Sequence, residues 1–256
     1  GELVKSLELK PFTSKENQLI ATEPLPYTIF GQNEIEAGAI EQMNKAMRLP
    51  ITQKGALMAD AHQGYGLPIG GVVATKNSII PYGVGMDIGC RMCISVYDIS
   101  PTILQKDKTK LKQLLIDETR FGNDEFSKPS VHAILERREF REISFLKTLQ
   151  SKAYSQIGTS GHGNHFVDFG ELEITDANNE WNVLPGKYFA ILSHSGSRGM
   201  GAEIARHYTR IAKDICNLPK GFTELSWLGL NSQEGQEYWL AMNLAGDYSA
   251  ANHEII

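Results

Sequence analysis

The stretch Gly83–Cys90 combines three glycines with a carboxylate and a thiol three residues apart. Glycines allow positive backbone φ angles, so the chain can turn tightly and bring the side chains of Asp87 and Cys90 towards one point. A carboxylate and a thiol held in this way can bind a metal ion, although Asp-x-x-Cys in a turn is more often structural. The metal interpretation therefore depends on which other residues accompany the pair.

Two further glycine-rich stretches carry histidines. Residues 158–165 end in His165 and lead into an apolar segment, whereas residues 188–199 run from an apolar strand into His194 and a polar turn. Backbone N–H groups in such loops can bind phosphate oxygens. The polar turn also places Arg198 and two serines at the expected start of a helix, where anions are favoured. Any one of these histidines alone could be a structural residue. Three glycine-rich loops at strand ends, which carry Asp87 and Cys90, His165 and His194, instead indicate a shared site.

A fourth polar site lies between two apolar segments. Residues 55–74 alternate short apolar runs with glycines, which predicts a strand, a loop and a second strand. Asp60 and His62 are two residues apart, so their side chains share a face of an extended segment. Two interpretations stay open: an Asp–His hydrogen bond that stiffens the loop, or a catalytic or metal-supporting role.

Apolar periodicity predicts the elements that hold these loops. We expect helices at about residues 34–47, 101–119 and 131–157. The segment Met92–Tyr97 is predicted to form a buried strand in which Cys93 is a small core residue. The elements do not alternate regularly as in a doubly wound sheet, so the expected fold class is α+β, with strands around a metal cleft and flanking helices.

Composition narrows the functional classes. The 256 residues are 41% hydrophobic but contain no apolar run of membrane-spanning length and no secretory signal pattern, so a cytoplasmic protein without a membrane partner is expected. Three cysteines, an odd number, argue against a disulfide framework. A net charge of -5 means that a nucleic-acid partner needs a local basic patch or a metal site.

Taken in order, four segments resemble the RtcB family of RNA-splicing ligases. They are Asp60–Gly64, Gly83–Cys90, Gly161–Phe166 and His194–Gly199. The resemblance spans nearly the whole chain after about residue 50, and the small-residue helix 238–253 is similar as well. It implies one RtcB-like domain over residues 1–256, as the N-terminal portion of a longer family fold.

The resemblance implies a ligase that joins RNA 3'-phosphate or 2',3'-cyclic phosphate ends to 5'-hydroxyl ends, using GTP and two manganese ions. By resemblance, Cys90 would bridge the two metals, Asp87 and His165 would complete one site, and His194 would serve the other. The nucleotide would lie against Asn164, His165, Phe166, Val167 and Asp168. Metal-supporting or substrate contacts would come from Asp60, His62 and Arg198. Asp168 stands where the family usually has Glu, which shortens its reach by one methylene.

Divalent ions would neutralise the triphosphate and the RNA 3'-phosphate and hold the attacking and leaving oxygens in line. A thiolate with imidazoles binds zinc more tightly than manganese, so manganese follows from the resemblance alone. The family forms its GMP adduct on a histidine far towards the C-terminus, so the nucleophile is expected beyond Ile256.

Two other functions stay open: a binuclear metal phosphohydrolase that uses the same ligands to activate water, and a non-catalytic module that keeps the fold. The sequence leaves the RNA and the oligomeric state unspecified.

Overall fold

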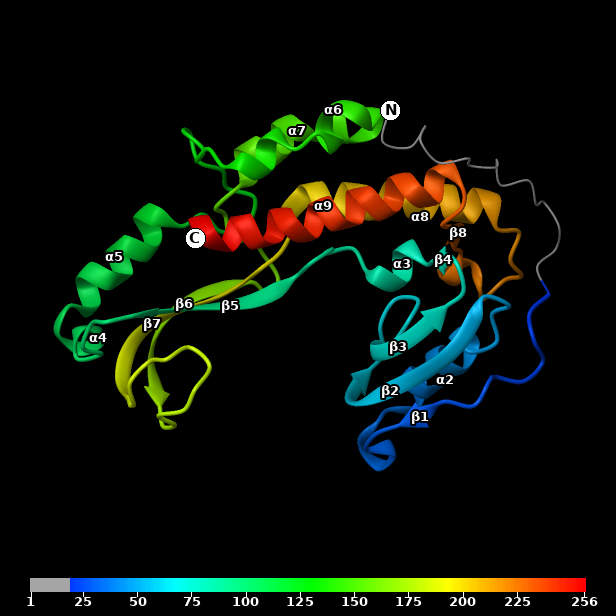
Figure 1. Cartoon of the computed structure of the whole chain (residues 1–256), viewed down its shortest axis with the longest axis horizontal. Helices are drawn as coiled ribbons and strands as arrows, with labels where there is room; N and C mark the ends of the chain where they lie inside the picture. Colours follow the sequence, from blue (N-terminus) through cyan, green and yellow to red (C-terminus); the bar gives the residue numbers. More distant parts are fainter. Residues whose placement is uncertain (1–18) are drawn as a thin grey trace. The chain divides into compact units, whose positions relative to one another are not determined.

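The computed structural model describes residues 19–256, which form an α+β fold of two compact units (Figure 1). The first unit comprises the described chain up to Met86 together with Ala202–Asn243, and the second comprises Asp87–Gly201 with Leu244–Ile256. The expected fold class is confirmed, whereas a single family-wide domain over residues 1–256 stays a prediction. No helix among the described residues has both the length and the apolar character needed to cross a membrane.

The first unit contains a three-stranded sheet, in which β2 (Thr52–His62) lies between β1 (Thr28–Ile29) and β3 (Ile69–Thr75). β2 and β3 are antiparallel, which confirms the predicted strand, loop and strand. Helix α2 (Ala37–Ala46) confirms the predicted first helix, and its buried Met43 packs in one cluster with Leu57 of β2.

Shorter elements complete the first unit. They are η1 (Gln32–Glu34), α3 (Pro81–Val84), η3 (Thr223–Leu225) and the paired strands β4 (Ser78–Ile79) and β8 (Leu228–Gly229). Two long helices, α8 (Arg198–Ile215) and α9 (Gln233–Ile255), contribute residues to both units. The predicted helix 238–253 is confirmed as part of α9.

The second unit contains an antiparallel sheet with β7 (Gly186–Ser195) between β5 (Arg91–Tyr97) and β6 (Phe166–Ile174). The last turns of α9 cover one face, where His253 lines a small cavity with Cys93. On the other face Met92, Ile94 and Val96 are 51%, 48% and 39% exposed. The prediction of a buried strand was wrong, because the described residues cover only one face of β5.

Two predicted helices of the second unit are interrupted. Residues 101–119 form α4 (Ile103–Lys106) and α5 (Lys108–Glu118). Residues 131–157 form η2 (Ala133–Glu136), α6 (Glu139–Glu142) and α7 (Ser144–Gln156). Ile143 adopts extended backbone angles while its side chain is buried, and Arg137 leaves helical geometry to bind Glu139 and Asp247. These tertiary contacts outweigh the helical periodicity.

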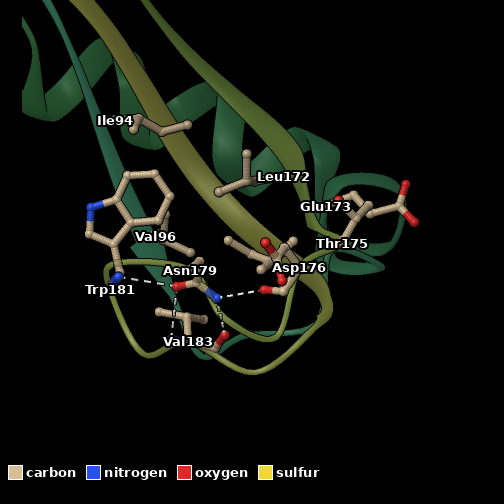
Figure 2. A pocket seen from close by; sticks show the side chains of 10 residues that line it. Ile94, Val96, Leu172, Glu173, Thr175, Asp176, Asn179, Trp181 and Val183 are labelled. Carbon is tan, nitrogen blue, oxygen red and sulfur yellow. Dashed lines mark hydrogen bonds between the residues drawn. The ribbon is translucent and has the colours of Figure 1, made fainter.

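A loop after β6 forms an apolar pocket of about 520 Å³ on the open face of this sheet (Figure 2). Asn179 organises the loop, since its Nδ2 donates to the carbonyls of Asp176 and Val183 at 2.8 and 2.7 Å. Its Oδ1 accepts from the backbone N–H groups of Trp181 and Val183, both at 3.2 Å. The side chains of Trp181 and Leu172 line this pocket.

Asn252 of α9 ties the helix to the loop that precedes β6. It is fully buried, and its Oδ1 accepts from Gly158 N–H at 2.7 Å. Its Nδ2 donates to the carbonyl of Thr159 and to Ser195 Oγ, both at 3.0 Å. The neighbouring His253 contacts β7 through Ser195 O at 3.2 Å, and burial lowers the pKa of this imidazole, which keeps it neutral.

Replacing Asn252→Ala should lower the free energy of unfolding by about 3 kcal/mol, because it leaves buried N–H and C=O groups without partners. Asn243→Ala is the matched control: Asn243 is exposed on the same helix and donates only to Trp239 O. The control should change stability by less than about 0.5 kcal/mol. Urea unfolding followed by circular dichroism measures both, and equal effects would contradict the role of Asn252.

Candidate metal centre

Strand register gathers three potential ligands at one end of the second unit's sheet. Phe166 at the start of β6 pairs with His194 near the end of β7, and β5 begins opposite Ser195. Cys90 immediately precedes β5 and His165 immediately precedes β6, so both arrive beside His194. Ligand atoms of these three residues all lie within 4.8 Å of one another.

The thiol of Cys90 lies between the two imidazoles. Its Sγ is 3.4 Å from His165 Nε2 and 3.0 Å from His194 Nε2. Asp87 approaches from the His165 side, with 2.8 Å between its Oδ2 and His165 Nε2. The structure therefore brings together all four residues that the sequence nominated as metal ligands.

The Nδ1 atoms of both imidazoles, whose Nε2 atoms face Cys90, lie close to backbone carbonyls. His194 Nδ1 lies 2.9 Å from Asn164 O, so Nδ1 carries the proton and Nε2 presents a lone pair to the centre. His165 Nδ1 lies 3.0 Å from Ser160 O but also 3.1 Å from Arg198 Nη1. A carbonyl accepts and a guanidinium donates, so the tautomer of His165 depends on what binds its Nε2.

A divalent cation fits this donor set. With Nδ1 of His165 protonated, the lone pair of its Nε2 meets the Asp87 carboxylate, and two acceptors at 2.8 Å repel unless a positive charge lies between them. A carboxylate, a thiolate and two imidazoles match the ligands of divalent transition metals. Carbonyl contacts that orient the imidazoles are typical of metal sites.

The local charges favour an ionised carboxylate and a protonated thiol. Burial raises the pKa of Asp87, but hydrogen bonds from His165 and Cys90 and attraction to Arg198 outweigh it, so the net pKa lies below its ordinary value. Burial, followed by the charge of Asp87, raises the pKa of Cys90 to about 12. A metal that binds Cys90 at neutral pH must therefore displace a proton.

Two glycines make room for the charged groups. A Cβ at Gly196 would lie 2.2 Å from Asp87 Oδ1. A Cβ at Gly161, whose φ is +104°, would lie 2.1 Å from the guanidinium of Arg198. The sequence showed these positions only as parts of glycine-rich loops, and it did not indicate which side chain each one accommodates.

The residues expected at the nucleotide divide between the two faces of β6. Phe166 and Asp168 share the face of His194, since they pair with His194 and Leu192 of β7. Asn164 is exposed, whereas the side chain of Val167 points to the other face and is 6% exposed. Nucleotide binding by these residues stays a prediction.

The remaining candidate residues are Asp60, His62 and Arg198, and their surroundings differ. Asp60 and His62 are exposed on β2 of the first unit, and His62 Nδ1 contacts the backbone carbonyl of Asp60 at 3.0 Å. The hydrogen bond between them thus involves the backbone and not the carboxylate. Arg198, the first residue of α8, adopts a φ of +57° and directs its guanidinium to His165 and Thr159.

Ser195 and Ser197, expected at an anion-binding helix start, are fully buried. Ser195 Oγ donates to Ser160 O at 2.8 Å and Ser197 Oγ donates to Ile88 O. These hydroxyls hold the histidine loop and the Asp87 turn in place. Their position beside a glycine is the only signal in the sequence that could have indicated this packing role.

Comparison with known proteins agrees with this geometry. The family model described as tRNA-splicing ligase RtcB matches residues 42–144 and 136–256. The chain belongs to the RtcB family. RNA-splicing ligase RtcB homolog 1 of Entamoeba dispar is 29% identical over an alignment that covers 85% of this chain and 48% of that protein.

Two prokaryotic RtcB proteins show similar relationships. The tRNA-splicing ligase RtcB of Methanococcus maripaludis is 29% identical over 87% of this chain and 54% of its own length. RNA-splicing ligase RtcB of Escherichia coli K12 is 28% identical over 77% of this chain and 49% of its own length. The chain thus spans about half the length of the curated RtcB relatives it matches.

Gly196→Ala should weaken Mn²⁺ binding at least about tenfold, because the new methyl group displaces the Asp87 carboxylate. Gly170→Ala on β6 is the control, since a Cβ there has no neighbour within 4 Å. Isothermal titration calorimetry measures both affinities. Equal affinities in the two variants would show that the position of Asp87 does not matter for metal binding.

Metal affinity should rise with pH, by about tenfold per unit between about pH 7 and 9, because each unit below the Cys90 pKa of about 12 multiplies the thiolate fraction tenfold. Cys90→Ala should abolish stoichiometric binding in the protein. Titrations in buffers of different ionisation enthalpy count the released proton. Retained stoichiometric metal in the variant would exclude Cys90 as a ligand.

Proposed function

We propose that this chain supplies the metal site and part of the nucleotide site of a GTP- and Mn²⁺-dependent RNA ligase. The reaction joins RNA ends bearing a 3'-phosphate or 2',3'-cyclic phosphate to 5'-hydroxyl ends. The observation that carries the proposal is the placement of the Cys90 thiol between two imidazoles, with Asp87 beside one of them.

The residues of this arrangement could hold divalent metal ions. Asp87 and His165 would hold one ion and His194 the other, with Cys90 as the ligand common to both. Bound divalent ions supply positive charge that neutralises phosphoryl oxygens. The chain's own contribution is to orient both imidazoles through Asn164 O and Ser160 O and to keep the Asp87 carboxylate ionised.

The nucleotide would bind to the face of β6 that carries Phe166, the residue that pairs with His194 of β7. Phe166 offers a ring surface 5.7 Å from the imidazole of His194, measured between ring centroids. Asp168 is exposed one step further along the same face and can accept hydrogen bonds from a guanine base. Asn164 is exposed at the start, and Val167 would contribute its backbone only, because its side chain is buried.

The guanylylated histidine of this proposal lies outside the chain. His253 does not suit the role, because it is 7% exposed, and Ser193 Oγ and Ser195 O occupy its two ring nitrogens. Arg198 would donate to Thr159 Oγ1 and help to keep Asp87 ionised through its positive charge. The proposed partners are GTP and RNA, and the proposed compartment is the cytoplasm.

Mn²⁺-dependent GTP binding tests the proposal directly. Asp168→Ala should weaken GTP binding about tenfold and reduce the preference for GTP over ATP, because the carboxylate that accepts from guanine is removed. Glu173→Ala is the control, since Glu173 is an exposed carboxylate of the same strand that alternates to the other face. Equal affinity for GTP and ATP in the unaltered protein would contradict the nucleotide assignment.

The intact mass after incubation with GTP and Mn²⁺ tests where the adduct forms. The 28.4 kDa chain should bind GTP without gaining a covalent guanylyl group. A GMP adduct on this chain would show that one of its own histidines is the nucleophile. Release of phosphate from a model ester without GTP would instead identify a metal phosphohydrolase.

A further inference from the structure

A groove of about 590 Å³ in the first unit combines cations with exposed tyrosine. We call it the α8 groove. The lining residues that matter for its chemistry are Tyr65, Tyr82, Arg206, Arg210 and Lys213. All of them belong to the first unit, whereas the metal ligands all belong to the second unit.

Three cations lie at helical spacing along α8. Arg206, Arg210 and Lys213 are four and three residues apart, so they project from one side of the helix. Arg206 contacts Glu203 at 2.7 Å and Lys213 contacts Glu224 at 2.8 Å. Such exposed ion pairs contribute little to stability, so a phosphate can replace the carboxylate partner.

Arg210 is the most available of these cations. It is exposed, and no ion pair of Arg210 occurs within residues 19–256. The groove also contains the carboxylates of Asp214 and Glu224, so three cations and two anions leave a net charge of +1. Binding of a polyanion there must therefore depend on stacking as well as on charge.

Tyr65 supplies a surface for stacking. Its side chain is 79% exposed, and its ring centroid lies 6.0 Å from that of Tyr82 at an interplanar angle of 51°. Lys213 Nζ lies 5.5 Å from the centre of the Tyr82 ring. Exposed aromatic rings beside cations are how proteins bind single-stranded nucleic acids, since bases stack on the rings while phosphates meet the cations.

We propose that the α8 groove binds single-stranded RNA. A base stacks on Tyr65, and backbone phosphates contact Arg206, Arg210 and Lys213. The choice of RNA as the polymer rests on the proposed function, whereas the groove itself rests on the contacts above.

Fluorescence anisotropy with a labelled single-stranded RNA of about 12 nucleotides tests the groove. EDTA is present throughout, so that metal-dependent binding does not contribute. Tyr65→Ala should weaken binding about tenfold through lost stacking. Arg210→Ala should weaken it about threefold at about 50 mM salt and reduce the slope of log K against log salt by about 0.7.

Matched controls lie in the second unit. Trp181→Ala removes an aromatic side chain that is 67% exposed, and Arg141→Ala removes an exposed arginine of α6. Both controls should bind RNA like the unaltered protein.

The outcomes distinguish this proposal from the proposed ligase function. Weaker RNA binding in the Tyr65→Ala and Arg210→Ala variants, with unchanged controls, supports the groove. RNA binding that the groove variants do not alter overturns it, as does an absence of RNA binding in the unaltered protein. Neither negative result affects the ligase proposal, which Mn²⁺ and GTP binding decide separately.

Discussion

The antiparallel register of β5, β7 and β6 is the constraint on which the metal centre depends. β7 is the middle strand, so the starts of β5 and β6 both lie beside its end, where His194 is found. Side chains alternate between faces with a period of two, and a slip of one residue would turn His194 to the opposite face. Helix α9 holds the register in place, because Asn252 and His253 bind the backbone or side chain of Ser195.

Electrostatics determine what this arrangement can do. Four potential ligands converge while the nearby guanidinium of Arg198 favours ionised Asp87, and burial holds Cys90 as a thiol. The centre is thus prepared for a cation that replaces the thiol proton. The absence of side chains at Gly196 and Gly161 is as important as the ligands, since it leaves space for Asp87 and Arg198.

Sequence patterns predicted elements well where local periodicity agreed with packing. Helix α2 and the β2–β3 pair were predicted from their apolar patterns, and α9 was predicted from the family resemblance; all are present. The patterns failed at Asp107 and Ile143, where the chain breaks helices that periodicity would continue. They also failed at β5, because an apolar run does not show whether one or both faces are covered.

The sequence by itself determined the chemical inventory and the family: the order of the four motifs, the ligand types, and the glycines that permit tight turns. Only the tertiary structure decided that Cys90 lies between the two imidazoles and that Asp60 meets His62 through a backbone carbonyl. The physical reason is the separation along the chain over which each effect acts. Propensity and periodicity act over a few neighbouring residues, whereas register, burial and hydrogen-bond satisfaction depend on contacts between residues far apart in the chain.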